Sequence, residues 1–82
     1  MVANIEDRLL NDQVLLDVRR MMNHLPASQR EVVYMRFYQQ LSFKEIADTT
    51  NVSINTALGR MRYALINMRR MARDYDMQLQ LS

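Results

Sequence analysis

The sequence predicts an all-α fold in which four helices form one domain over residues 1–82, the last two making a helix-turn-helix without winged elements. Three observations predict it. The 82 residues include one glycine and one proline, whereas a sheet of this size needs several tight turns made from those residues. Runs that alternate apolar and polar residues are missing. Apolar residues recur instead every three or four positions, as one face of a helix requires.

The first helix is predicted over residues 1–24. It ends before Pro26 because the residue that precedes a proline is disfavoured in the α conformation. Acidic residues lie in its first turn and basic residues near its end, as the helix dipole favours. Its apolar residues at helical spacing are Leu10, Val14, Val18, Met21 and Leu25.

The second helix is predicted over residues 26–40, and its start has two interpretations. Pro26 suits a first helical position, since the missing N–H is not needed there. Alternatively, Ser28 and Glu31 form a capping box, in which each residue bonds the backbone of the other. The apolar residues of this helix, including Tyr34 and Tyr38, wrap more than one face, so the helix should contact several neighbours.

Residues 42–73 are predicted to form the helix-turn-helix. Ser42 and Glu45 make a second capping box that opens a short helix. This helix ends near Asn51, one of the few non-glycine residues that tolerate a left-handed backbone. Ala47 is small enough for the two helices to cross there. Ser53 then caps a long recognition helix, and the tail, residues 74–82, is expected to fray or to make one final turn.

The single glycine, Gly59, lies inside this last helix, where glycine costs about 1 kcal/mol relative to alanine. At 100° per residue it falls opposite the apolar stripe, so it does not serve close packing in the core. A missing side chain on the outward face lets another molecule approach the backbone. The stripe itself contains Ala57, Met61, Ala64, Met68 and Met71, with Ile54 and Leu65 at its edge, and the outward Ile66 is left unexplained.

Positive charge is concentrated on the same helix. Residues 1–41 carry five arginines and five acidic residues, whereas residues 53–73 carry five arginines and no acid. Asn55 can pair with an adenine edge, and Arg62 can fork onto guanine O6 and N7. Thr56, Arg60, Lys44 and Ser42 suit phosphate contacts. The alternatives are a solvated helix face, an ion pair of Arg60 with the preceding helix, and a half-buried packing role for Tyr63.

Other chemistries are not indicated. The chain has no cysteine and one histidine, which argues against disulfides and against a zinc site. No nucleophile–base set and no glycine-rich phosphate loop are present, so we expect neither an enzyme nor a cofactor. No segment has the length and hydrophobicity of a signal peptide or a membrane span, and a cytoplasmic protein without membrane contact is expected.

Residues 25–65, "LPASQREVVYMRFYQQLSFKEIADTTNVSINTALGRMRYAL", resemble the C-terminal domain, region 4, of bacterial RNA polymerase sigma factors. The resemblance is strongest to the extracytoplasmic-function group. It rests on the L-P-x-x-Q-R-E-V opening, R-F, L-S-x-x-E-I-A, V-S-x-N-T and R-x-R-x-A-L, in this order. Such a series of motifs is far more specific than a helix-turn-helix alone.

The resemblance implies a domain that reads the −35 promoter element with the helix beginning at Ser53, while another surface binds the β flap of core RNA polymerase. Leu58 and Gly59 stand where many members have lysine and serine, and Tyr63 stands where arginine is frequent. These departures suggest weaker DNA contact or a different base preference. The candidate DNA-binding residues are Ser42, Lys44, Ser53, Asn55, Thr56, Gly59, Arg60, Arg62 and Tyr63.

Alternatives to promoter reading are an output domain of a LuxR-type response regulator, which would bind palindromes as a dimer, and a module that docks only on polymerase or on an anti-sigma factor. Region 2, the domain of sigma factors that opens the −10 element, has no counterpart in these residues. We therefore expect a domain excised from a longer sigma factor in preference to a stand-alone protein. Apolar residues on two sides of the first two helices also suggest that the isolated domain forms a homodimer.

Overall fold

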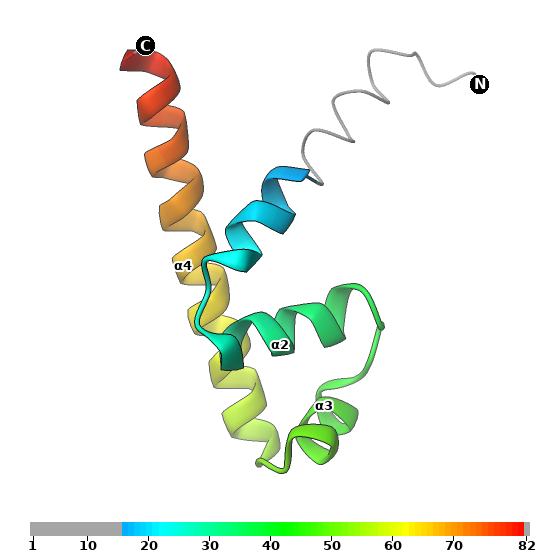
Figure 1. The fold of residues 1–82 in the computed structure, drawn as a ribbon. Helices are drawn as coiled ribbons and strands as arrows, with labels where there is room; N and C mark the ends of the chain where they lie inside the picture. The colour runs from blue at the N-terminus through cyan, green and yellow to red at the C-terminus, as the bar shows by residue number, and fades with distance from the viewer. Residues whose placement is uncertain (1–15, 82) are drawn as a thin grey trace, which may run out of the picture.

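The computed structural model describes residues 16–81, with side chains described as far as residue 74 (Figure 1). Within this range every regular element is a helix: residues 16–23, α2 (Ala27–Phe37), α3 (Phe43–Thr50) and α4 (Ile54–Leu81). The all-α fold with four helices is confirmed for this part of the chain. Leu10 and Val14, expected on the first helix, lie outside the described residues.

The long helix α4 organises the fold. Figure 1 shows α2 crossing the middle of α4, and α3 lying beside the beginning of α4. Both α2 and α3 pack against α4, and they also contact each other. Apolar side chains from all four helices, and from Leu25 in the connection between the first helix and α2, form one core. Its buried members are Met22, Leu25, Val32, Val33, Met35, Ile46, Ala47, Ala57, Met61 and Ala64.

Two details at the start of the fold differ from prediction. Met21 was predicted to face the core, but Met21 is half-buried and Met22 is buried instead. Met22 lies four residues after Val18, whereas Met21 lies three residues after it, and both intervals fit one face of a helix. Pro26 is the N-cap of α2, and the Ser28–Glu31 capping box is absent. The carbonyl of Pro26 already accepts the N–H groups of Gln29 and Arg30, so the helix starts one residue after the proline and Ser28 falls within its first turn.

The start and end of α3 confirm the sequence prediction. Glu45 N–H donates to Ser42 Oγ at 3.1 Å, and Ser42 N–H donates to Glu45 Oε1 at 3.0 Å. Asn51 adopts the left-handed conformation (φ 60°, ψ 43°), and its N–H donates to the carbonyl of Ala47. Val52 N–H donates to the same carbonyl at 3.0 Å. The turn between α3 and α4 is therefore fixed by its own backbone.

The Glu45 capping bond makes stability depend on pH. The N–H of Ser42, followed by its side chain, lowers the pKa of the Glu45 carboxyl below its usual value. A carboxyl whose pKa is lower in the folded state stabilises the fold above its unfolded pKa, about 4.3, and this contribution is lost as pH falls through the folded pKa.

Glu45→Gln is therefore expected to make unfolding by urea less sensitive to pH between about pH 6 and about pH 3. The matched control is Glu31→Gln, at an exposed glutamate that caps no helix. An equal pH response in wild type and in Glu45→Gln would show that the capping bond does not form in solution.

The loop between α2 and α3 contains a feature that the sequence did not predict. Gln40 has a positive φ of 56°, a conformation in which glycine would be expected. Leu41 N–H donates to the carbonyl of Met35, and Arg36 Nη1 donates to the carbonyl of Leu41 at 2.9 Å. The Arg36 guanidinium also lies 5.1 Å from the centroid of the Phe43 ring. Arg36 thus joins the end of α2 to the loop and to the start of α3.

The last helix is longer than predicted. Residues 74–81 continue α4 as regular helix to Leu81, so the prediction of a frayed tail from residue 74 is wrong. No glycine or proline follows Gly59, and nothing in the sequence stops the helix. With 28 residues, α4 is about 42 Å long. Neither α4 nor any other described helix combines the length and hydrophobicity of a membrane span.

Candidate nucleic-acid interface

The orientation of α4 is set by its apolar stripe. Ala57, Met61 and Ala64 are buried, while Leu65, Met68 and Met71 are partly buried against the core. The stripe matches the predicted one, except that Ile54 at its edge is exposed. Because these positions face α2 and α3, the opposite face of α4 is turned to solvent.

Gly59 lies on the solvent side, and a Cβ atom placed there would meet nothing within 4 Å. Core packing therefore does not require a glycine at this position. Asn55 and Arg62 are exposed nearby on the same side of the helix, and Tyr63 is 62% exposed. The half-buried packing role considered for Tyr63 is thus wrong. An amide, a bare stretch of backbone and a guanidinium follow one another over two turns of α4.

Ser53 and Thr56 form a pair at the start of α4. Thr56 N–H donates to Ser53 Oγ at 3.1 Å, which is the geometry of an N-cap, and the capping role predicted for Ser53 is confirmed. The Ser53 hydroxyl in turn donates to Thr56 Oγ1 at 2.9 Å. The Ser53 proton is therefore engaged within the protein, whereas the Thr56 hydroxyl keeps its own proton for an external acceptor such as a phosphate oxygen.

The start of α3 carries Ser42 and Lys44, both exposed. The sequence argument relied on a helix N-terminus that attracts anions. In the structure the Glu45 carboxylate already accepts a backbone N–H there, and its negative charge opposes that of a phosphate. A phosphate role at this end of α3 therefore depends on the ammonium group of Lys44 more than on the helix dipole.

Arg60 is half-buried on α4. The predicted alternative was an ion pair with α3, but among the described residues Arg60 forms no such pair.

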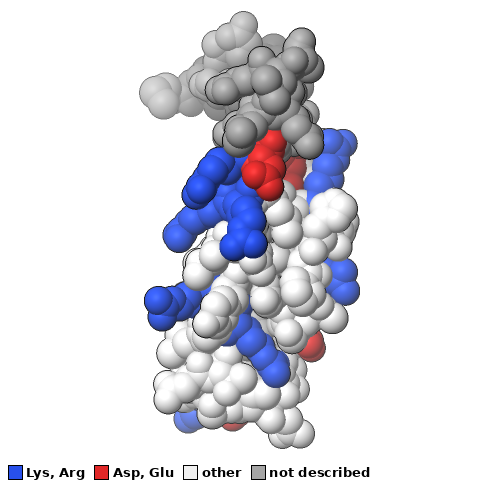
Figure 2. All heavy atoms as spheres, turned by 90° about the vertical axis from the view of Figure 1, so that its left-hand side faces the viewer, with Lys and Arg blue, Asp and Glu red and all other residues white. Residues whose placement is uncertain are grey.

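The exposed face of α4 is strongly cationic. Figure 2 shows Lys and Arg side chains along the length of this face, with acidic side chains at its margins and beside the undescribed atoms. The sequence has no acid between Asp48 and Asp74. The described residues contain no cluster of His, Cys, Asp or Glu side chains that could hold a metal ion. This surface suits a polyanion and not a metal or a cationic ligand.

A short helix, a three-residue turn and a long exposed basic helix form a helix-turn-helix. The family model "Sigma-70, region 4" matches residues 15–65, which is more than half of the chain. The chain belongs to the sigma-70 region 4 family. No curated protein matches the sequence.

Region 4 is the part of a sigma factor that binds DNA and docks on polymerase, and members of this family are not enzymes. Membership therefore gives the chain a role of this kind. The match includes α2, α3 and the first twelve residues of α4, Ile54–Leu65. The remainder of α4, from Ile66 to Leu81, extends beyond the matched residues.

Sequence reasoning missed two hollows in the surface of the region 4 domain. One lies between the first helix and α2, beside Tyr34 and Tyr38. The other lies along α4 beside Phe43. Both hollows contain large apolar side chains that are partly exposed. Large apolar residues outside the core stripes were the sequence signal that could have indicated these hollows. A helical wheel places them outside the core stripe but does not show that neighbouring elements leave a hollow around them.

Proposed function

We propose that this domain reads the −35 promoter element in the major groove with the beginning of α4 while it docks on core RNA polymerase. The observation that supports the DNA-reading role is the open row on α4, where Asn55 and Arg62 are exposed and no side chain fills the space beside the half-buried Gly59. The first turns of a recognition helix are the part that contacts base edges.

In this proposal each side chain has a chemical role. Asn55 pairs with an adenine, and Arg62 donates two hydrogen bonds to a guanine, each pair contributing about 1–3 kcal/mol of discrimination. Gly59 admits the edge of the groove close to the helix backbone. Thr56, with its free hydroxyl proton, and the cations Lys44 and Arg60 contact phosphates and fix the register. Tyr63 and Ser42 lie at the margins of this contact.

Selection of binders from a pool of random DNA duplexes at low salt tests the proposal, since phosphate contacts weaken steeply as salt rises. A short asymmetric motif is the expected result. A palindromic motif would contradict it in favour of a response-regulator output domain. If the folded domain enriched no sequence, α4 would contribute only electrostatic attraction, and protein binding would be the main activity.

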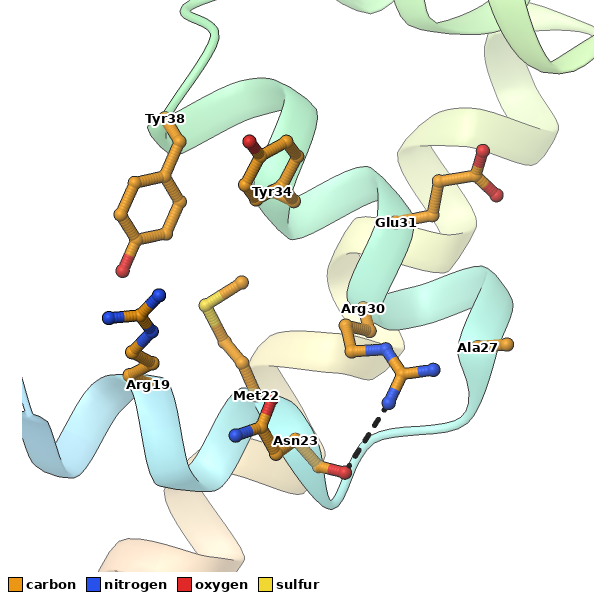
Figure 3. Close-up of a pocket in the computed structure, with 8 residues that line it drawn as sticks. All are labelled: Arg19, Met22, Asn23, Ala27, Arg30, Glu31, Tyr34 and Tyr38. Atoms are coloured by element: carbon orange, nitrogen blue, oxygen red, sulfur yellow. Dashed lines mark hydrogen bonds between the residues drawn. The ribbon is translucent and has the colours of Figure 1, made fainter.

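The proposed polymerase-docking surface is the groove between the first helix and α2, which has a volume of about 650 Å³. Tyr34 and Tyr38 stack in it, with ring centroids 5.4 Å apart, and both rings are exposed along one side. Figure 3 shows Met22 and Arg19 of the first helix pointing toward these rings. Stacked tyrosines beside an arginine are typical of the residues that dominate protein interfaces. We propose the β flap as the occupant.

The double variant Tyr34→Ser with Tyr38→Ser is expected to weaken binding to a β-flap fragment by about tenfold or more, since buried aromatic anchors dominate interfaces. Affinity for the selected DNA should stay unchanged, because neither ring lies on α4. Tyr63→Ser, at another exposed tyrosine, which lies on α4, provides the reciprocal control. Equal flap binding by wild type and the double variant, measured by calorimetry, would exclude this groove as the docking surface.

The extracytoplasmic-function type is proposed on the motifs of residues 25–65 alone. An anti-sigma partner and a homodimer of the isolated domain are proposed on the apolar surface of the first helix and α2.

A further inference from the structure

Leu58 is a large apolar side chain on the part of α4 that is proposed to enter the major groove. It is 43% exposed, and it lines the hollow along α4, about 470 Å³ in volume, together with Phe43 and Leu65. Phe43 and Leu65 are partly buried against the core, whereas Leu58 is not among the core residues. The fold therefore does not account for a leucine at this position, and the candidate DNA-binding residues chosen from the sequence do not include it.

Leu58 lies between the two proposed base readers. At 100° per residue it falls about 60° from Asn55 and about 40° from Arg62 around the helix. Along the helix axis it lies about 4.5 Å beyond Asn55 and about 6 Å before Arg62. The whole interval is about 10 Å, which is close to three base-pair steps of about 3.4 Å each. When Asn55 and Arg62 contact base edges, Leu58 faces the base pairs between them.

The neighbouring glycine allows a leucine to reach the bases. A leucine side chain is shorter than an arginine side chain, so Leu58 can contact a base edge only where the helix backbone comes close to the floor of the groove. In the free domain nothing lies within 4 Å of a Cβ atom placed at Gly59. The missing side chain leaves room for the close approach that Leu58 needs.

The chemistry of leucine restricts what Leu58 can recognise. Its side chain has no hydrogen-bond donor or acceptor, so it cannot bond to a phosphate or to the polar atoms of a base edge. The apolar group that the major groove presents is the C5 methyl group of thymine. Contact between this methyl group and a leucine removes apolar surface of both from water, and this favours thymine over the other bases.

We propose that Leu58 is a specificity-determining residue that selects thymine, by packing against the C5 methyl group of a thymine between the base pairs read by Asn55 and Arg62. This assignment rests on the proposed function, and it names a third base that the same site reads. Along α4 an amide, an apolar side chain and a guanidinium then select adenine, thymine and guanine in turn.

The test replaces thymine by uracil in the duplex that the domain selects from the random pool. Uracil keeps the hydrogen-bonding groups of thymine and lacks only the methyl group. Each thymine of the motif, on either strand, is replaced in turn, and dissociation constants are measured by fluorescence anisotropy at constant salt. We expect one replacement inside the motif to weaken binding by the wild-type domain about fourfold, which corresponds to about 0.8 kcal/mol for one buried methyl group.

Matched variants assign this effect to a side chain. Leu58→Ala is expected to bind the thymine and uracil duplexes equally at that position, because the group that covers the methyl is gone. Any effect of uracil on the DNA itself cancels, since both proteins are measured on the same pair of duplexes. Alanine is a good helix former, so the variant should unfold at nearly the same urea concentration as wild type.

The control for Leu58→Ala is Ile66→Ala, at an isoleucine that is 39% exposed about two turns further along α4. It should keep the fourfold difference between thymine and uracil. The length of α4 from Asn55 to Ile66, about 16 Å, exceeds the width of the major groove, about 12 Å.

Three outcomes would overturn the assignment of Leu58 while leaving base reading by Asn55 and Arg62 intact. They are equal binding of all thymine and uracil duplexes by the wild-type domain, a difference that survives in Leu58→Ala, and a difference that disappears in Ile66→Ala. If the folded domain selects no motif from the random pool, the proposed function fails, and the thymine assignment fails with it.

Discussion

Ile46→Ala is expected to bring the domain close to unfolding at room temperature. Ile46 has no exposed surface and lies on α3 between α2 and α4. Truncating a fully buried isoleucine costs about 2–5 kcal/mol, through lost burial and the cavity left behind. A domain of this length has roughly 4–12 kcal/mol in total, so the melting temperature should fall by more than about 10 °C. Urea unfolding followed by circular dichroism measures the loss.

The matched control for this prediction is Ile54→Ala, at an isoleucine that is 45% exposed on α4. Its effect should stay within about 0.5 kcal/mol, since exposed substitutions away from special features are nearly neutral. Equal urea midpoints for Ile46→Ala and wild type would mean that α3 does not pack between α2 and α4 as the structure shows.

Arg62→Ala is expected to remove most of the sequence preference of the domain. If the guanidinium donates two hydrogen bonds to one guanine, its loss costs about 1–3 kcal/mol at that base pair, or roughly 5- to 150-fold in discrimination. Affinity for a scrambled duplex should fall much less. Fluorescence anisotropy with the selected duplex and with duplexes changed at single base pairs gives both values, provided that the salt concentration is held constant.

Arg70→Ala is the control for Arg62→Ala, because Arg70 is also exposed on α4 but lies two turns further from Ser53. It should weaken all duplexes alike and reduce the salt dependence. A loss of affinity in Arg62→Ala that is equal on selected and scrambled DNA would assign Arg62 to a phosphate and not to a base.

The helix-turn-helix was predictable because its signals are local. Ser42 with Glu45, Asn51 and Ser53 each act within three or four residues, and the structure confirms all of them. The start of α2 was ambiguous because Pro26 and Ser28 both carry start signals two residues apart. The structure places the start of α2 directly after Pro26, because the carbonyl of Pro26 accepts backbone N–H groups of the first helical turn. No pattern of side chains in the sequence reveals such a backbone hydrogen bond.

Other features depend on contacts distant in sequence. The two grooves arise where the first helix meets α2 and where Phe43 meets α4, and periodicity within a single helix cannot place them. Arg36 is similar, since its bonds to Leu41 and Phe43 depend on the path of the loop. The length of α4 was a different kind of error. Residues 74–81 contain no stop signal, and the general tendency of terminal residues to fray was given too much weight.

Among residues 16–81, the left-handed turn positions are Gln40 and Asn51, and both carry side chains. Glycine would relieve local strain there, but it would also increase the conformational freedom of the unfolded chain, and folding would then lose more entropy. Asn51 joins α3 to α4, and two N–H groups bond to the Ala47 carbonyl across this joint. The two helices are therefore preorganised before any ligand arrives. A domain built in this way loses little further conformational freedom when α4 binds a ligand, so more of its contact energy remains as affinity.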